Sequence, residues 1–201
     1  GYLSLGMLYE NGLGVRKSYA KALELYQKAA DKGNSNGVLN IGTCYDNGHG
    51  VEQNIQKAME YYQKAADLGN PVAMFNLGLA YEKGQGVEQN FKKAFDFYKK
   101  SADLGDSYSM YNLALLYNNG QGCQKDYSKA LEYFIKSAEL GNSKGLYSLG
   151  VVYYTGNGLK QSYAKACQCY QKAADLDHPK ALYSLGICYQ KGQGVVKDPK
   201  K

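Results

Sequence analysis

The chain repeats itself every 36 residues, and this period constrains its fold more than any other feature of the sequence. A tyrosine recurs at this step, at Tyr9, Tyr45, Tyr81, Tyr117, Tyr153 and Tyr189. Two glycine columns keep the same step, one from Gly12 to Gly192 and the other from Gly14 to Gly194. No insertion breaks this register across the 201 residues. A short segment repeated in this way predicts a row of similar structural units that stack on their neighbours.

Each repeat is expected to contain two helices, here called helix A and helix B. In the third repeat, apolar residues recur at helical spacing from Ala73 through Leu77 to Tyr81, which predicts an amphipathic helix A. Gly84 and Gly86 follow it. Because glycine adopts the left-handed backbone with which a chain leaves a helix, we expect this G-x-G to end helix A. Valine follows in most repeats and is expected to fill the corner between the two helices.

Capping residues mark where the helices begin. Asn90 precedes helix B of the third repeat, and its side chain is suited to accept a bond from a free backbone amide of the first turn. The equivalent caps in the other repeats are Ser18, Asn54, Asp126, Ser162 and Asp198. A second column of caps precedes the next helix A, at Asn34, Asn70, Asp106, Asn142 and His178. Both helices are therefore short, with tight turns between them.

A pair of short helices cannot bury its apolar face alone, so neighbouring pairs must stack. The expected fold is all-α, an α/α solenoid of antiparallel helix pairs. We expect a single domain over residues 1–201, and a segment of a longer chain, because the sequence begins inside helix A and stops as a helix B starts. The expected repeats are 1–36, 37–72, 73–108, 109–144, 145–180 and a partial repeat at 181–201.

A further glycine column lies inside helix A. It comprises Gly6, Gly42, Gly78, Gly150 and Gly186, with Ala114 as the exception. A glycine in mid-helix costs about 1 kcal/mol relative to alanine, so we expect another helix to press closely against the backbone there. Alanine pairs of helix B, such as Ala29 and Ala30, are the small partners that this spacing suggests.

The consensus A-x-x-x-L-G-x-x-Y-x-x-G-x-G-V…(D/N)-x-x-K-A-x-x-x-Y-x-K-A-A-x-x-G resembles the Sel-one-like repeat (SLR) family, a relative of the tetratricopeptide repeat. The resemblance covers essentially the whole chain. The departures from it are Cys123 and Leu159 in the valine column, Phe134 in a tyrosine column, and Ser101 and Ser137 in the alanine pair. The resemblance implies a superhelix whose concave face is built from the A helices. It also implies a non-catalytic adaptor, a protein-protein interaction scaffold that assembles complexes.

The chemical motifs in the chain are weak. The G-x-G at Gly48 and Gly50 lacks the third glycine of a dinucleotide fingerprint, since Gln53 stands there, and no G-K-S/T follows. His49 occupies a turn position that varies between repeats and is expected to face solvent. Cys167 and Cys169 share columns with large apolar residues, where cysteine packs as a small hydrophobe. We therefore expect no enzyme, no cofactor and no metal site.

Helix A offers a candidate binding strip, because four columns cluster opposite its core face at about 100° per residue. Asparagine amides beside tyrosine rings are suited to bind the backbone of an extended peptide. The alternative is that these residues follow the ordinary repeat pattern and pack against a neighbouring helix. The candidate partner-binding residues are Asn40, Asn76, Asn112, Phe75, Tyr111, Tyr147, Tyr183, Lys83, Asn119 and Lys191.

Charge and cysteine content bear on partners and compartment. The net charge of +6 is spread along the chain, which disfavours a nucleic-acid patch. Lysines recur on helix B, where a solvated outer face is the favoured interpretation. No apolar run is long enough to span a membrane. The five irregularly spaced cysteines favour reduced thiols and an intracellular, cytoplasmic location, with the endoplasmic-reticulum lumen and organelles left open. The alternatives to an adaptor are a structural subunit of a large complex and, third, an RNA or polyanion binder.

Overall fold

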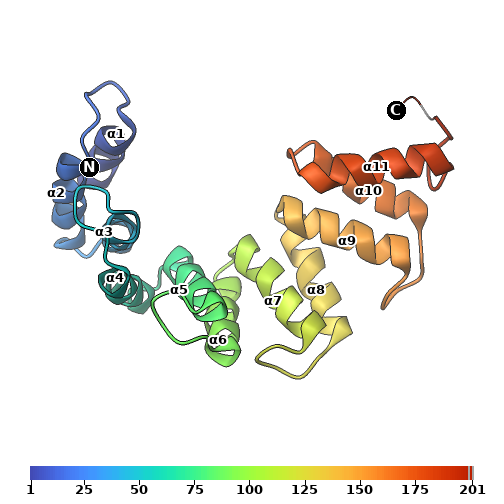
Figure 1. The fold of residues 1–201 in the computed structure, drawn as a ribbon, viewed down its shortest axis with the longest axis horizontal. Coiled ribbons are helices and arrows are strands. Elements are labelled where there is room, and N and C mark those ends of the chain that lie inside the picture. The colour runs from blue at the N-terminus through green and yellow to red at the C-terminus, as the bar shows by residue number, and fades with distance from the viewer. Residues whose placement is uncertain (199, 201) are drawn as a thin grey trace. The chain divides into compact units, whose positions relative to one another are not determined.

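The computed structural model describes residues 1–198 and 200, and these residues form helices and turns without a strand (Figure 1). The A helices carry odd numbers and the B helices even numbers. The helices are α1 (Tyr2–Asn11), α2 (Tyr19–Ala30), α3 (Ser35–Asn47), α4 (Ile55–Asp67), α5 (Pro71–Lys83), α6 (Phe91–Asp103), α7 (Ser107–Asn119), α8 (Tyr127–Glu139), α9 (Ser143–Thr155), α10 (Tyr163–Ala174) and α11 (Pro179–Lys191). The all-α fold of successive helix pairs is confirmed.

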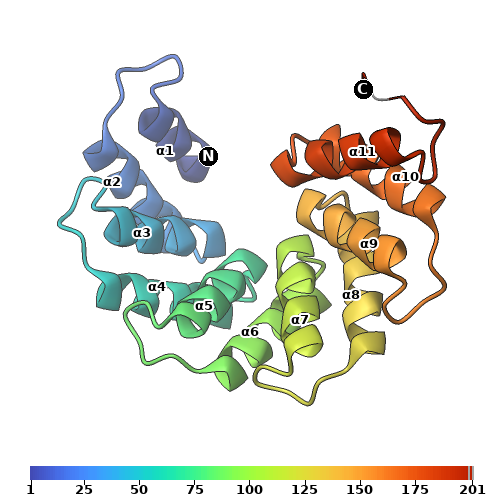
Figure 2. The same ribbon diagram turned by 45° about the vertical axis from the view of Figure 1, so that its right-hand side comes forward.

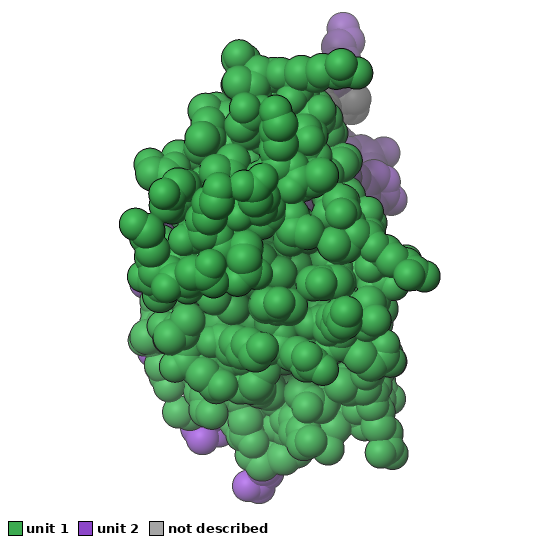
Figure 3. All heavy atoms as spheres, turned by 90° about the vertical axis from the view of Figure 1, so that its left-hand side faces the viewer, with its two compact units in different colours: residues 1–104 green, residues 105–201 purple. Residues whose placement is uncertain are grey.

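The chain forms two compact units, residues 1–104 with α1 to α6 and residues 105–201 with α7 to α11. Figure 3 shows the surface of unit 1. Within each unit every helix packs against the next helix in the chain. In unit 1, α1, α3 and α5 form one layer and α2, α4 and α6 form the other (Figure 2). The A helices of a unit therefore share one face, and we call it the A-helix face.

The predicted caps of α2, α4, α6, α8 and α10 are confirmed, whereas no described helix follows Asp198, so that cap stays a prediction. Each of the five side chains accepts a bond from the backbone N–H three residues on, at Ser18, Asn54, Asn90, Asp126 and Ser162. Four caps of the A helices do the same, at Asn34, Asn70, Asp106 and Asn142. The cap prediction for His178 is wrong, because its side chain makes no such bond and its ring stacks on Tyr147, with 4.6 Å between centroids.

The G-x-G turns end the A helices as predicted. Gly48 is the left-handed C-cap of α3, with φ of 72°. Gly50 has φ of 76° and lies against the preceding repeat, where an added Cβ would come within 2.8 Å of the Tyr19 backbone. This turn is therefore a joint between repeats as well as between two helices. Val51 is half-buried and packs on the core of α2 and α3, as expected for the corner position.

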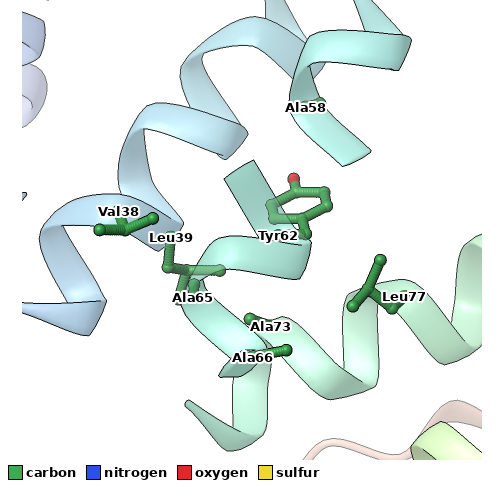
Figure 4. Packing of buried hydrophobic residues seen from close by; sticks show 8 residues of the cluster. All are labelled: Val38, Leu39, Ala58, Tyr62, Ala65, Ala66, Ala73 and Leu77. Carbon is green, nitrogen blue, oxygen red and sulfur yellow. The ribbon is translucent and has the colours of Figure 1, made fainter. Parts of the chain in front are cut away.

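The core consists of similar clusters that recur along each unit. Figure 4 shows one of them, in which Tyr62 of α4 lies between residues of α3 and α5. The members of this cluster are Val38, Leu39, Ala58, Tyr62, Ala65, Ala66, Ala73 and Leu77. Because this cluster takes residues from three successive helices, the pair of α3 and α4 does not complete its core without α5.

The partner of the mid-helix glycines differs from the prediction. A Cβ on Gly78 would lie 2.7 Å from two ring carbons of Tyr98, so a buried tyrosine ring occupies the space that glycine leaves free. The alanine pair instead meets the start of the next helix A, since a Cβ on Gly37 would lie 2.8 Å from the Cβ of Ala29. The reason is side-chain direction, because long helical side chains lean toward the N-terminus of their own helix.

Candidate functional site

The aromatic residues of the predicted strip lie at the junction of helices A and B. Phe75 packs against Tyr98 with ring centroids 5.9 Å apart, and Tyr147 packs against Tyr170 at 5.7 Å. Tyr111 occupies the equivalent position and packs against a ring of its own helix B at 6.1 Å. These three rings are half-buried, whereas Tyr183 is 74% exposed. The strip therefore has an aromatic floor that belongs partly to the core.

The polar residues of the strip differ in exposure. Asn40, Asn76 and Asn112 are half-buried on their A helices. Lys83, Asn119 and Lys191 are exposed in the last turns of α5, α7 and α11. The strip residues thus lie on one helix face within each unit, and the exposed polar groups among them lie at the C-terminal end of their helices. The role of this face in partner binding is a prediction.

Beneath the strip, buried tyrosine hydroxyls donate to carboxylates of helix A. Tyr26 donates to Glu10 at 2.5 Å, and Tyr62 donates to Asp46 at 3.1 Å. In the third repeat, the Tyr98 hydroxyl donates to Glu82 in the same way, at 2.5 Å. Burial raises the pKa of the Tyr62 hydroxyl, with a smaller contribution from the charge of Asp46, so the phenol stays protonated and remains a donor.

Sequence reasoning missed this pairing, although the sequence carries a signal for it. The fourth repeat has Phe134 in place of the tyrosine and Asn118 in place of the acid. A ring without a hydroxyl needs no acceptor, so the loss of both groups in this repeat fits a contact between the two columns, whereas the fifth repeat keeps Tyr170 and has Tyr154 in the acid column. The exceptional Ala114 of the glycine column stands in the same repeat.

A pocket of about 260 Å³ opens between the second and third repeats of unit 1. Asp46 and Thr43 of α3 line it on one side, and Asn76 of α5 lines it on the other. Its walls also include apolar side chains of α4 and α5, among them Ile55 and Leu79. The pocket therefore combines one carboxylate, the two amides of Asn76 and Gln85, and an apolar wall.

Unit 2 has a pocket at the equivalent position between the fourth and fifth repeats, with a volume of about 400 Å³. Asn118 stands where Asp46 stands in the first pocket, and Ser148 stands where Asn76 does. The ring of Phe134 replaces the buried tyrosine, and Val151 lies on the facing helix. This second pocket has the same location in the repeat without a carboxylate in its lining.

The chain fills two other pockets of this kind with its own side chains. His49 stacks on Tyr19 with 4.0 Å between centroids, and its Nδ1 lies 3.7 Å from Glu10 Oε1. Tyr154 donates to Gln193 Oε1 at 2.8 Å in the corresponding space between the fifth and sixth repeats. The prediction that His49 faces solvent is therefore wrong, because the turn that carries it packs onto the repeat before.

The lysine columns of helix B cover aromatic rings. Lys57 Nζ lies 5.2 Å from the ring centroid of Tyr45, and Lys64 Nζ lies 5.0 Å from that of Tyr61. The two rings stack with their centroids 5.6 Å apart, so each ring of the stacked pair has one ammonium group near it. Similar pairs occur in the third and fourth repeats. These lysines are also exposed, so the solvated helix B face that the sequence favoured is confirmed, and the rings beneath the ammonium groups are a contact that the sequence did not predict.

The cysteines are free thiols, and Cys44, Cys167 and Cys188 are buried. Burial raises the pKa of the Cys44 thiol to about 12, and it does the same for Cys167. The described residues contain no group of three or more His, Cys, Asp or Glu side chains arranged to hold a metal ion. None of the described helices has both the length and the apolarity that a membrane crossing requires.

Comparison with known families matches the chain from end to end. A model described as the Sel1 repeat matches six times, at residues 1–34, 36–70, 71–106, 107–142, 143–178 and 179–201. No curated protein matches the chain.

Several solved structures are similar to the chain. A Sel1 repeat protein from Oxalobacter formigenes has a TM-score of 0.93 and 31% identity, with 100% of this chain and 81% of the other covered. A protective antigen present in uropathogenic Escherichia coli strains, described as displaying an SLR fold, has a TM-score of 0.87 and 30% identity. That match covers 99% of this chain and 43% of the antigen. Cysteine rich protein B of Helicobacter pylori has 29% identity and a TM-score of 0.52, covering 65% of this chain and 94% of the other.

Proposed function

The chain belongs to the Sel1 repeat family, and from this premise we propose that it is a non-catalytic interaction scaffold that binds a partner protein or peptide on its A-helix face. One observation carries the proposal. Pockets of similar construction recur at equivalent positions in unit 1 and unit 2, on the helices that bear the strip. Recurring pockets beside exposed polar side chains suit an extended segment whose own side chains repeat along its length.

The chemistry of the remaining groups supports a binding role over a catalytic one. The Cys44 and Cys167 thiols, with a pKa of about 12, carry almost no thiolate at neutral pH and are poor nucleophiles. The lysines above Tyr45 and Tyr61 are engaged with rings, which reduces their availability for a polyanion. Neither feature favours an enzyme or a nucleic-acid binder.

A structural subunit of a larger assembly is the second candidate. Leu182 of α11 lies outside the strip, and its apolar side chain is 61% exposed, which favours contacts beyond the strip. Such a subunit would use its B helices as well as its A helices. The two candidates therefore differ in which helix face a partner covers.

Affinity capture with paired variants separates these candidates. The strip variant combines Asn76→Ala, Lys83→Ala and Asn119→Ala on A helices. The control variant combines Gln56→Ala, Ser128→Ala and Gln168→Ala, which are exposed on B helices. We expect the strip variant to lose most of the recovered partner and the control to retain it, with unchanged circular dichroism for both. Retention by the strip variant and loss by the control would contradict the proposal and support the structural subunit.

A further inference from the structure

We propose that the pocket between the second and third repeats receives a basic side chain, lysine or arginine, from the bound segment, with its charged head on the Asp46 carboxylate. This inference rests on the proposed function and names the chemistry that one pocket of the A-helix face selects. The pocket lies within unit 1, where residues of α3, α4 and α5 line it, and Asp46 of α3 supplies its carboxylate.

The shape of the pocket suits one long side chain. Its volume of about 260 Å³ lies below the range of about 300–1,000 Å³ that small-molecule sites occupy. Ile55 and Leu79 provide an apolar wall, and Asp46, Asn76 and Gln85 provide oxygen acceptors. Lysine and arginine carry an apolar stem and a charged head, so they match a pocket that is apolar along one wall and polar elsewhere.

The charge of the pocket is not balanced from within. The Asp46 carboxylate accepts a bond from the Tyr62 hydroxyl through Oδ2. In the part of the chain that the structure describes, the ion pairs involve other acids, such as Glu24 with Lys28 and Asp96 with Lys92. A carboxylate has room for further donors on both oxygens, and a guanidinium or ammonium group supplies them with opposite charge.

The neighbouring repeat shows how such a group sits. Between the first and second repeats, His49 occupies the same position, with its ring on Tyr19 and its Nδ1 3.7 Å from Glu10 Oε1. Glu10 is the equivalent of Asp46, and His49 is the equivalent of Gln85. The chain thus places its own nitrogen base against the acid of this column in one repeat. In the next repeat a glutamine takes that place, and the acid is left for a base from another chain.

The pocket of unit 2 provides a control within the same molecule. Its lining has Asn118 where the first pocket has Asp46, and Phe134 where the first has Tyr62. It has the same position in the repeat and lacks the carboxylate. A preference for cations that comes from Asp46 should therefore be absent from this pocket, whereas a preference that comes from general pocket shape should be present in both.

Titration of the ¹⁵N-labelled full chain with ethylguanidinium chloride tests the inference without a partner. Ethylurea, a neutral molecule of similar shape, serves as the matched probe at the same ionic strength. We expect saturable shifts of the amide signals around Asp46, Asn76 and Gln85 with ethylguanidinium, and binding of ethylurea weaker by about threefold or more. Asp46→Asn should abolish this difference. Equal binding of the two probes, or a preference that survives Asp46→Asn, would overturn the inference.

Loss of binding in Asp46→Asn could arise from disturbed folding, so we also test variants that are expected to gain binding. Asn118→Asp should give the pocket of unit 2 a preference for ethylguanidinium, and His49→Gln should open a site beside Glu10 with the same preference. Failure of both to bind the cation would overturn the inference.

The outcome is separable from that of the proposed function. If the pocket binds the two probes equally while the strip variant still loses its partner, the scaffold role stands. The inference that a basic side chain enters the pocket is then wrong. If the cation binds at Asp46 while the strip variant retains its partner, the pocket has no part in partner binding and the inference falls.

Discussion

Replacing Gly78 with alanine should destabilise the protein, although the same change usually stabilises a helix. In an open helix position, glycine to alanine is worth about 1 kcal/mol in favour of alanine. Here the new Cβ would lie 2.7 Å from the Cδ1 and Cε1 atoms of Tyr98, whereas carbon atoms pack best at about 3.5–4.0 Å. Either the ring or the helix must therefore move by about 1 Å.

The ring of Tyr98 has little freedom to move. It is 0% exposed, and its hydroxyl donates to Glu82 at 2.5 Å. Overpacking of a buried site typically costs about 1–3 kcal/mol, and at the upper end of that range it exceeds the helix gain. We expect Gly78→Ala to lower the free energy of unfolding by up to about 2 kcal/mol, the overpacking cost less the helix gain, measured by urea titration with circular dichroism. Hydrogen exchange should show the loss in α5 and α6, because repeat arrays unfold in parts.

The chain provides its own control and its own rescue. Gly186 belongs to the same column, and a Cβ there would meet nothing within 4 Å, so Gly186→Ala should stabilise by about 0.5–1 kcal/mol. Tyr98→Phe removes the hydroxyl that anchors the ring. Combined with Gly78→Ala, it gives the pair of residues that the fourth repeat has at Ala114 and Phe134. The double variant should therefore lose less than the sum of the single changes. Equal stabilisation by Gly78→Ala and Gly186→Ala would refute the reasoning.

Three further predictions concern caps, thiols and lysines. His178→Asn should restore the missing cap and stabilise the protein by about 1 kcal/mol in urea titrations. Burial, and then the charge of Lys180, lower the pKa of His178 below its ordinary 6.5 in the folded state. The wild type should therefore lose stability as the pH falls below 6.5, and His178→Asn should remove this loss. Cys44, with a thiol pKa raised by burial to about 12, should resist iodoacetamide at pH 8 in the folded protein and react in urea, and equal rates would contradict the assignment. Lys93→Gln should cost about 0.5–1 kcal/mol by removing the ammonium group 4.9 Å from the Tyr81 ring centroid, whereas the exposed Lys83→Gln should be neutral in the same urea assay.

The sequence predicted those parts of the structure that depend on local signals. The caps at Asn54 and Asn90 and the turn at Gly48 each act within a few residues of themselves, so their positions give the helix bounds directly. The period of 36 residues then gives the repeat and its stacking.

The sequence did not predict contacts that depend on how two repeats meet. Gly42 and Tyr62 are 20 residues apart, and their contact depends on the direction in which a ring leans from α4 toward α3. His49 lies over Tyr19 because a turn of one repeat packs on the start of helix B in the repeat before. The pockets follow from these same contacts, so the column of Glu10 and Asp46 became a candidate site only in three dimensions.

The contact of Gly50 has a consequence for how such arrays grow. The atoms that its missing side chain would strike belong to the backbone of Tyr19 and Ala20, and Gly194 meets the backbone of Tyr163 and Ala164 in the same way. At these two joints the glycine contact does not depend on the residue types of the earlier repeat, whereas Gly86 meets the side chain of Ile55. A repeat that carries a joint of the first kind can therefore dock on a new predecessor without matched mutations at this contact, while a joint of the second kind ties two successive repeats to each other.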